Sequence, residues 1–110
     1  MQSKILISPV YISGPITGIE NANKEDFMKM EEMLVTMGYK VRNPRKHPIP
    51  KNLPKEDIWH VMMKISLKDM ICCNSMVMLN GWEFSRGAGI EFDLAKALKM
   101  PTTNQDLQTI

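Results

Sequence analysis

The feature that most constrains the fold is a short apolar segment followed by a glycine-rich turn and a helical repeat. The segment from Met76 to Leu79 has the length of a buried strand. The turn that follows is marked by Gly81, Ser85, Gly87 and Gly89. Beyond it, apolar residues recur at helical spacing at Ile90, Leu94, Ala97 and Leu98. A strand, a glycine-rich turn and a helix in this order favour an anion-binding site.

One carboxylate, Glu91, stands just inside this predicted helix. The glycines let the backbone approach a ligand closely, and the free N–H groups of the first helical turn point toward it. The helix dipole favours the ionised form of Glu91, which suits a nucleophile or a base better than an acid. The alternative is that Glu91 is a first-turn acid that only stabilises the start of a helix.

Length and composition indicate one globular domain, residues 1–110, with a hydrophobic core. A net charge of +2 does not favour a nucleic-acid polymer or a membrane as the partner. Neither a signal peptide nor an apolar run of membrane-spanning length is visible. The only cysteines, Cys72 and Cys73, are adjacent, which suits neither a disulfide nor a metal site. We therefore expect buried thiols in a reducing cytoplasm.

The other segments alternate between strand and helix. Strands are predicted at residues 5–13, 39–42, 75–79 and 100–103, and further helices at residues 24–37 and 55–71. Asn23 is the expected N-cap of the first helix, and Gly38 its stop. The buried stripes of these two helices are predicted to contain Phe27, Met30, Leu34 and Met37, and Ile58, Met62 and Ile65. The tail, residues 103–110, is expected to be loose.

This alternation predicts an α/β fold, with a parallel sheet of four to five strands and helices on both faces. In the first strand, Val10 and Ile12 should share one face, and Tyr11 and Ser13 the other. A second glycine-bounded turn, residues 14–18, follows that strand. Ligands bind beyond the carboxyl ends of such strands, so both glycine-bounded turns should border one cleft.

A proline-rich loop, residues 43–54, is long for a compact domain, and such loops are often lids or binding segments. Four cations lie in or beside it, at Arg42, Arg45, Lys46 and Lys51. A solvated loop explains them as well as a binding patch does.

Two motifs resemble the nucleoside 2-deoxyribosyltransferase-like superfamily, which includes the 2'-deoxynucleoside 5'-phosphate N-hydrolases. They are Tyr11-Ile12-Ser13-Gly14-Pro15-Ile16-Thr17-Gly18 and, far downstream, Gly81-Trp82-Glu83-Phe84-Ser85-Arg86-Gly87-Ala88 with Glu91. The likeness covers about residues 10 to 103 and is greatest to small phage and prophage members. It implies a flavodoxin-like (Rossmann-like) three-layer fold, no cofactor or metal, and a cytoplasmic homodimer in a bacterial or phage-infected cell.

The resemblance also implies roles for single residues. Glu91 matches the nucleophile that attacks the anomeric carbon of deoxyribose, and Tyr11 matches the tyrosine that positions it. Ser85, with the backbone near Gly87 and Gly89, matches the part that holds a 5'-phosphate. The residues expected to bind the substrate are Ser13, Gly14, Pro15, Ile16, Gly18, Trp82, Ser85, Arg86, Gly87 and Gly89.

Two positions depart from the family pattern. Ser66 stands where family enzymes commonly carry an aspartate on the second helix, and Asn74 where an aspartate is frequent before the third strand. Asp69 is one helical turn from Ser66 and is a possible substitute, although the interpretation as a surface acid is preferred. Glycosidic cleavage usually uses two carboxyl groups, and this sequence offers one convincing candidate.

Several side chains keep two interpretations. Trp82 could flank a nucleobase or pack the turn onto the core, and Trp59 is equally ambiguous. Arg86 could contact phosphate or be an ordinary exposed arginine. His47 and His60 have no partners at metal or triad spacing and are expected to be structural or solvent-facing.

Three functions therefore follow from the sequence. The first is an enzyme that cleaves or transfers the N-glycosidic bond of a 2'-deoxynucleoside or its 5'-monophosphate. The second is a protein of the same fold that binds a nucleotide without catalysis, to sequester or sense it. The third is a dimeric interaction protein that has kept only the fold.

Overall fold

Four parallel strands form one sheet in the computed structural model, which describes residues 6–16 and 19–110. The strands are β1 (Val10–Ser13), β2 (Val41–Arg42), β3 (Ser75–Met78) and β4 (Thr102–Thr103), in the order β2-β1-β3-β4. Val10 pairs with both Val41 and Ser75. This order is that of flavodoxin-like folds, so the predicted fold class is confirmed.

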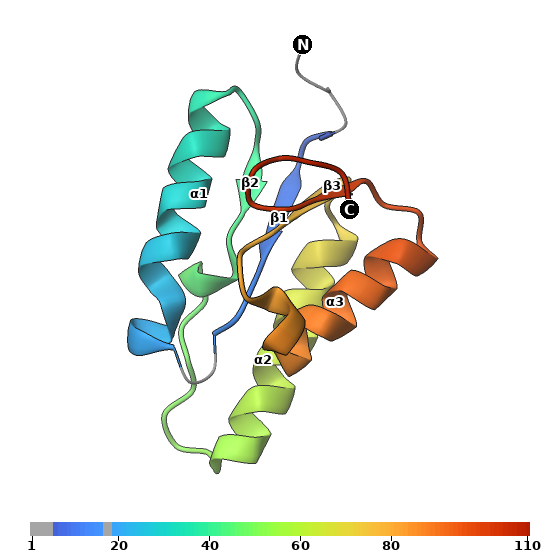
Figure 1. Cartoon of the computed structure of the whole chain (residues 1–110). Coiled ribbons are helices and arrows are strands. Elements are labelled where there is room, and N and C mark those ends of the chain that lie inside the picture. Colours follow the sequence, from blue (N-terminus) through green and yellow to red (C-terminus); the bar gives the residue numbers. More distant parts are fainter. Residues whose placement is uncertain (1–5, 17–18) are drawn as a thin grey trace.

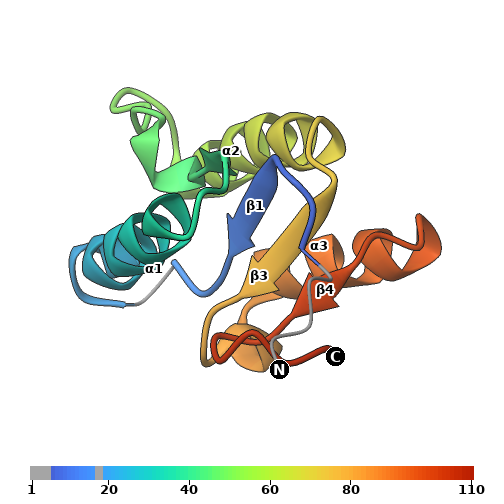
Figure 2. The same ribbon diagram turned by 90° about the horizontal axis from the view of Figure 1, so that it is seen from above.

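Three helices cover the two faces of the sheet (Figures 1 and 2). Helix α1 (Lys24–Thr36) packs on one face, whereas α2 (Lys55–Ile71) and α3 (Arg86–Ala97) pack on the other. Three short 3-10 turns, η1 (Glu20–Asn23), η2 (Pro44–Lys46) and η3 (Trp82–Phe84), lie in the connections. The molecule thus has the predicted three layers.

The alternation along β1 places its residues in two cores. Val10 and Ile12 pack against Phe27 of α1, and Tyr11 packs on the opposite side against Met70 of α2. All four residues of β1 are buried, because helices cover both faces of the sheet.

The first strand is shorter than predicted. It begins at Val10, after Pro9, which has no N–H to donate to a neighbouring strand; residue 5 lies outside the described residues. Asn23 does occupy the N-cap position of α1, but with a left-handed backbone (φ 59°) and no capping bond from its side chain. Its amide instead donates to the carbonyl of Pro15 at 2.9 Å, which ties the first turn to α1.

Two predicted apolar stripes need correction. Met37 is 40% exposed, because α1 ends at Thr36; the left-handed Gly38 (φ 97°) follows as expected. In α2, whose predicted bounds are confirmed, the buried residues are Ser66 and Met70, while Ile58, Met62 and Ile65 are only half-buried.

Helix α3 begins earlier than its apolar repeat indicated, at Arg86. Its buried residues are Ala88, Glu91 and Ala95, whereas Ile90 and Leu98 are exposed. The prediction erred because a carboxylate stands in the middle of the buried stripe, where an apolar pattern does not show it.

The C-terminal tail is folded back onto the sheet rather than loose. Thr109 forms an antiparallel bridge with Thr103, and the N–H of Ile110 donates to the carbonyl of Thr102 at 3.1 Å. Leu107 and Ile110 pack against the two cores, which explains why a mostly polar tail is held in place.

Of the two free thiols only Cys73 is buried, and Cys72 is exposed. No helix within residues 6–16 and 19–110 is long and apolar enough to cross a membrane.

Candidate active site

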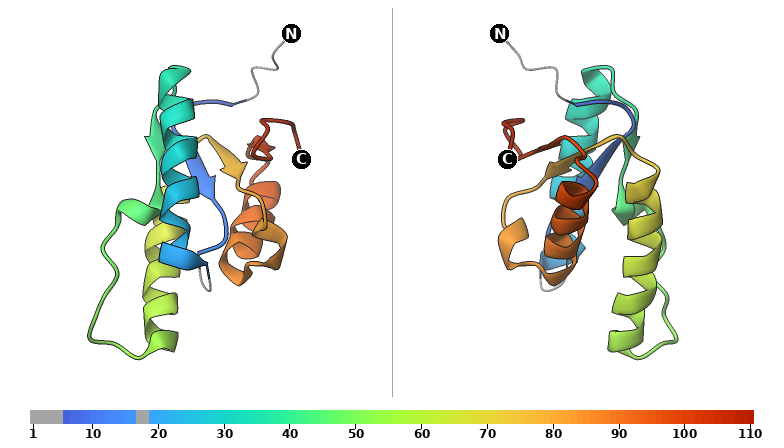
Figure 3. Two further views of the ribbon diagram at one scale, coloured as in Figure 1. Left: turned by 60° about the vertical axis from the view of Figure 1, so that its left-hand side comes forward. Right: turned by 90° about the vertical axis from the view of Figure 1, so that its right-hand side faces the viewer.

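A cavity of about 940 Å³ opens at the carboxyl ends of β1 and β3. Its walls come from three places: the residues after β1, the proline-rich loop (residues 43–54) together with the first half of α2, and the start of α3. Figures 1 and 3 show that this loop and the start of α2 project beyond the edge of the sheet, so the cavity has a tall wall on that side. Its volume suits a ligand the size of a nucleotide.

Glu91 lies at the foot of this cavity and is only 5% exposed. Tyr11 donates its hydroxyl to Oε2 of Glu91 at 2.6 Å, and Ser13 donates its hydroxyl to Oε1, also at 2.6 Å. Both donors stand on the same face of β1, as the sequence predicted, and the structure shows that β1 is the neighbour of β3. The two bonds hold the carboxyl group in one orientation and leave a lone pair on each oxygen for a ligand.

Burial raises the pKa of Glu91 from 4.5 to about 7, against the opposing effect of the bonds from Ser13 and Tyr11. Burial and not the helix dipole therefore governs the ionisation of Glu91, contrary to the prediction from sequence. Because α3 starts at Arg86, Glu91 lies beyond its first turn, where the dipole has fallen off. Glu91 is therefore poised between its two protonation states near neutral pH. It is also not the first-turn acid of the alternative interpretation.

Tyr11 stays protonated throughout the useful pH range. Burial, followed by the charge of Glu91, raises the pKa of its phenol well above 10. Tyr11 is therefore a permanent hydrogen-bond donor to the carboxylate and not a proton acceptor.

Ser85 caps the start of α3 on the same cavity wall. Its hydroxyl oxygen accepts from the N–H of Ala88 at 3.2 Å, which leaves the hydroxyl proton for a ligand. A Cβ on Gly87 would lie 3.0 Å from the sulfur of Met63, so this flexible side chain would have to shift by a few tenths of an ångström. Ser85 and Gly87 thus line the cavity at the start of α3, and the first N–H groups of a helix have no partner within the helix.

The two glycine-bounded turns meet, as predicted. A Cβ on Gly14 would lie 2.8 Å from the Cβ of Leu79, so the first turn requires a glycine where it crosses the end of β3. Gly81 has a left-handed backbone (φ 87°), and a Cβ there would lie 3.5 Å from Pro15. Gly14, Pro15 and Ile16 line the cavity. The expected contribution of Gly18 falls outside the described residues.

The second helix supplies Ser66 but not Asp69 to the cavity. Ser66 is buried and lines the wall beside Tyr11. Asp69 faces away: its Oδ1 lies 3.2 Å from Nη1 of Arg42, and its Oδ2 is hydrogen-bonded to Nε2 of His47. Asp69 is thus engaged in an ion pair and does not replace the missing acid, and His47 has a structural role as its partner.

Three more sequence expectations are changed or refined. The ring of Trp82 packs on Phe92, with ring centroids 4.4 Å apart, and it does not line the cavity, which supports its packing role. Gly89 also lies outside the cavity wall. Arg86 does line the cavity, with its guanidinium 3.8 Å from the ring centroid of Trp59.

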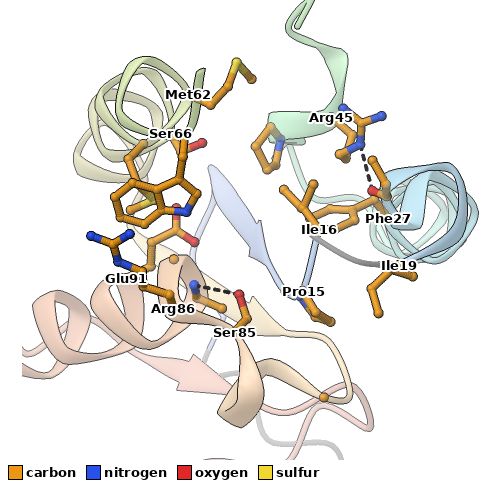
Figure 4. A pocket seen from close by; sticks show the side chains of 18 of the residues that line it. Pro15, Ile16, Ile19, Phe27, Arg45, Met62, Ser66, Ser85, Arg86 and Glu91 are labelled. Carbon is orange, nitrogen blue, oxygen red and sulfur yellow. Dashed lines mark hydrogen bonds between the residues drawn. The ribbon is translucent and has the colours of Figure 1, made fainter. Parts of the chain in front are cut away.

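The sequence left open whether the proline-rich loop is a binding segment or a solvated loop, and in the structure its residues help to line the cavity. Arg45 and Ile49 line the cavity from this loop, and Trp59 and Met62 line it from α2. In Figure 4, Arg45 lies on the side opposite Glu91. Two signals were available: the unusual length of the loop and the cations in it. Neither distinguished a binding wall from a solvated loop, because direction depends on how the loop folds back over α2.

Asn74, the other departure from the family pattern, lies at the amino end of β3, where its amide donates to the carbonyl of Ser8 at 2.7 Å. It is therefore remote from the cavity. Among residues 6–16 and 19–110, no group of three or more His, Cys, Asp or Glu side chains could hold a metal ion.

The order of its strands defines a flavodoxin-like α/β protein, with a cavity at the carboxyl edge of the sheet. Residues 8–104 match the family described as "Domain of unknown function (DUF4406)", and the chain belongs to that family. No curated protein matches the sequence significantly.

The structure is similar to that of a 2-deoxyribosyltransferase from the psychrotolerant bacterium Bacillus psychrosaccharolyticus. The TM-score is 0.66, and the match covers 86% of this chain and 69% of that one, with 17% sequence identity. At this identity the likeness shows a shared fold.

Proposed function

We propose that the protein cleaves or transfers the N-glycosidic bond of a 2'-deoxynucleoside or its 5'-monophosphate, with Glu91 as the nucleophile. The observation that carries this proposal is a buried glutamate at the foot of a nucleotide-sized cavity, held by hydroxyl groups on both oxygens. The structural likeness to a 2-deoxyribosyltransferase supports the same class of chemistry.

In the proposed reaction an oxygen of Glu91 forms a bond to C1' of the sugar while the bond from C1' to the base nitrogen breaks. The electron pair of the broken bond leaves with the base, and a deoxyribosyl ester of Glu91 results. Attack by water completes hydrolysis, and attack by a second base completes transfer. Glu91 must be ionised to attack, so the rate should rise with pH up to the pKa of Glu91, near 7.

The start of α3 is the proposed phosphate site. Ser85 and the first N–H groups of the helix offer donors to an anion, and Arg86 brings a positive charge to the same wall. A 5'-monophosphate held there would direct its sugar toward Glu91.

The direct test is incubation with a panel of deoxynucleosides and their monophosphates, with free base followed by chromatography. The wild-type protein should release base, and Glu91→Gln should not. Asp93→Asn is the matched control, because Asp93 is an exposed carboxylate on the same helix. Base release that survives Glu91→Gln would refute the proposal.

A second candidate, nucleotide binding without turnover, is favoured by one observation. Ser66 occupies the cavity wall at the position where family enzymes commonly carry an acid. This function predicts that a deoxynucleotide raises the melting temperature, since a ligand stabilises the state that it binds, while no base is released.

The family resemblance also leads us to propose a homodimer whose subunits complete each other's sites. Phe84, which lines the cavity, is 94% exposed, as expected for a side chain that a second subunit covers. Light scattering of the purified protein, compared with Phe84→Ser, tests this assembly.

A further inference from the structure

Arg45 stands on the cavity wall without an anionic partner. It belongs to η2, the 3-10 turn that follows β2, and it lies across the cavity from Glu91 (Figure 4). Its Nε donates to the carbonyl of Ala22 at 2.9 Å, which fixes the plane of the guanidinium. The side chain is half-buried. A guanidinium held in this way has its terminal N–H groups left for other acceptors.

The other two arginines of the chain are paired. Arg42 lies 3.2 Å from Asp69, and Arg86 lies 3.6 Å from Glu56. Beside Arg45 in sequence, Lys46 is also paired, 2.6 Å from Glu31. Among the described residues, no carboxylate lies within 4.0 Å of Arg45. A partly desolvated charge is costly without a partner, so its position favours an acceptor on a ligand.

The surroundings of Arg45 indicate which end of the ligand it meets. Pro44, Ile49, Ile58 and Met62 line the cavity from η2, the loop and α2, and their apolar side chains suit the faces of a nucleobase. The proposed phosphate site is at the start of α3, on the other side of the cavity. Arg45 would therefore face the base and not the phosphate.

Besides Glu91, only one carboxyl group among the described residues lines the cavity. Ser66 stands where family enzymes commonly carry an aspartate, and Asp69 is turned away into its ion pair. The other carboxylate on the wall, Glu56, is exposed and lies beside Arg86. Negative charge that develops on a leaving base thus needs another form of stabilisation.

We propose that Arg45 supplies this stabilisation: its guanidinium donates hydrogen bonds to an acceptor atom of the leaving base as the C1'–N bond breaks. The electron pair of that bond goes to the base nitrogen and spreads over the ring to the acceptor that Arg45 contacts. The base leaves as an anion paired with Arg45 and then takes a proton from water. This inference rests on the proposed glycosidic chemistry of Glu91.

The test compares Arg45→Gln with the wild-type protein on pairs of monophosphates that differ in the acidity of the base, such as uracil and 5-fluorouracil, or adenine and 8-azaadenine. Glutamine keeps an N–H for the Ala22 carbonyl but removes the charge. We expect kcat/KM to fall on the order of 100-fold for the poorer leaving group, as for loss of one preorganised donor, and clearly less for the more acidic base. Arg45→Lys keeps the charge, and its kcat/KM should lie between those of the wild-type protein and Arg45→Gln.

Lys46→Gln is the matched control, because it removes a neighbouring charge that does not line the cavity. Melting temperatures of both variants separate folding defects from chemical ones. If Arg45→Gln lowered kcat/KM equally for both monophosphates of a pair, or for neither, the role of Arg45 would be overturned while the function of Glu91 stayed intact. A wild-type protein that releases no base from any substrate would overturn both.

Discussion

Replacing Glu91 with glutamine should stabilise the fold at neutral and alkaline pH and leave it almost unchanged in mild acid. The pKa of Glu91 is raised from 4.5 to about 7 in the folded protein, because its carboxyl group is buried. Between these two values the unfolded chain has lost the proton that the folded protein still holds. The free energy of unfolding therefore falls as pH rises through this window, and it stops falling above about 7.

The size of the effect follows from the same two values. A rise from 4.5 to about 7 corresponds to roughly 3 kcal/mol, at about 1.4 kcal/mol for each pH unit. In a domain of this length that amounts to a difference in melting temperature on the order of 10 °C. Glutamine resembles the protonated acid in shape and carries no charge, so the free energy of unfolding of the variant should not fall as pH rises through this window.

Urea denaturation of both proteins near pH 5, 6, 7 and 8 measures the difference directly. We expect the two free energies of unfolding to agree near pH 5 and to diverge toward pH 8, with the glutamine variant the more stable. Asp93→Asn, an exposed change on the same helix, should give a curve parallel to that of the wild-type protein. A constant gap between wild type and Glu91→Gln at all pH values would refute the reasoning.

Four further substitutions test the same site and the elements that position it. Tyr11→Phe removes one of the two hydrogen-bond donors to Glu91 and should raise the pKa of the carboxyl further, by about one to two pH units. Base release near pH 7 should therefore fall and should partly recover near pH 9. Ser85→Ala removes the helix cap and should lower the free energy of unfolding, measured by urea denaturation, by about 1 kcal/mol. The same variant should lower kcat/KM about tenfold or more for a monophosphate but little for a nucleoside. Gly14→Ala should destabilise by about 1–3 kcal/mol through contact with Leu79, whereas Gly89→Ala, which meets nothing within 4 Å, should stabilise by up to about 1 kcal/mol.

Local patterns were sufficient to predict the layers, whereas the pairing of Tyr11 with Glu91 was predicted from the family resemblance. The alternation in Val10 to Ser13 set two faces of one strand, and this is why Tyr11 and Ser13 both reach Glu91. The bounds of α2 also followed from sequence, because Pro54 precedes its first residue and the helix ends at Ile71 before the apolar run of β3.

Features that depend on tertiary packing could not be read in the same way. The buried face of α3 contains Glu91, so an apolar repeat pointed to the wrong side of the helix. The partner of Asp69 is Arg42, 27 positions away, and the contact exists only because α2 packs beside β2. Arg45 was visible only as one of several cations, and its place on the cavity wall depends on the bond from its Nε to the carbonyl of Ala22.

The most direct test of the central claim is to trap the ester on Glu91. A monophosphate with fluorine at the 2' position of an arabino sugar should slow hydrolysis of the ester, because fluorine withdraws electrons from C1' and disfavours the oxocarbenium-like transition state. Intact-mass and peptide analysis should then find the fluorosugar phosphate on the peptide that carries Glu91, and on no peptide of Glu91→Gln. Base release from the wild-type protein with no adduct on Glu91, or with an adduct on another residue, would contradict the account.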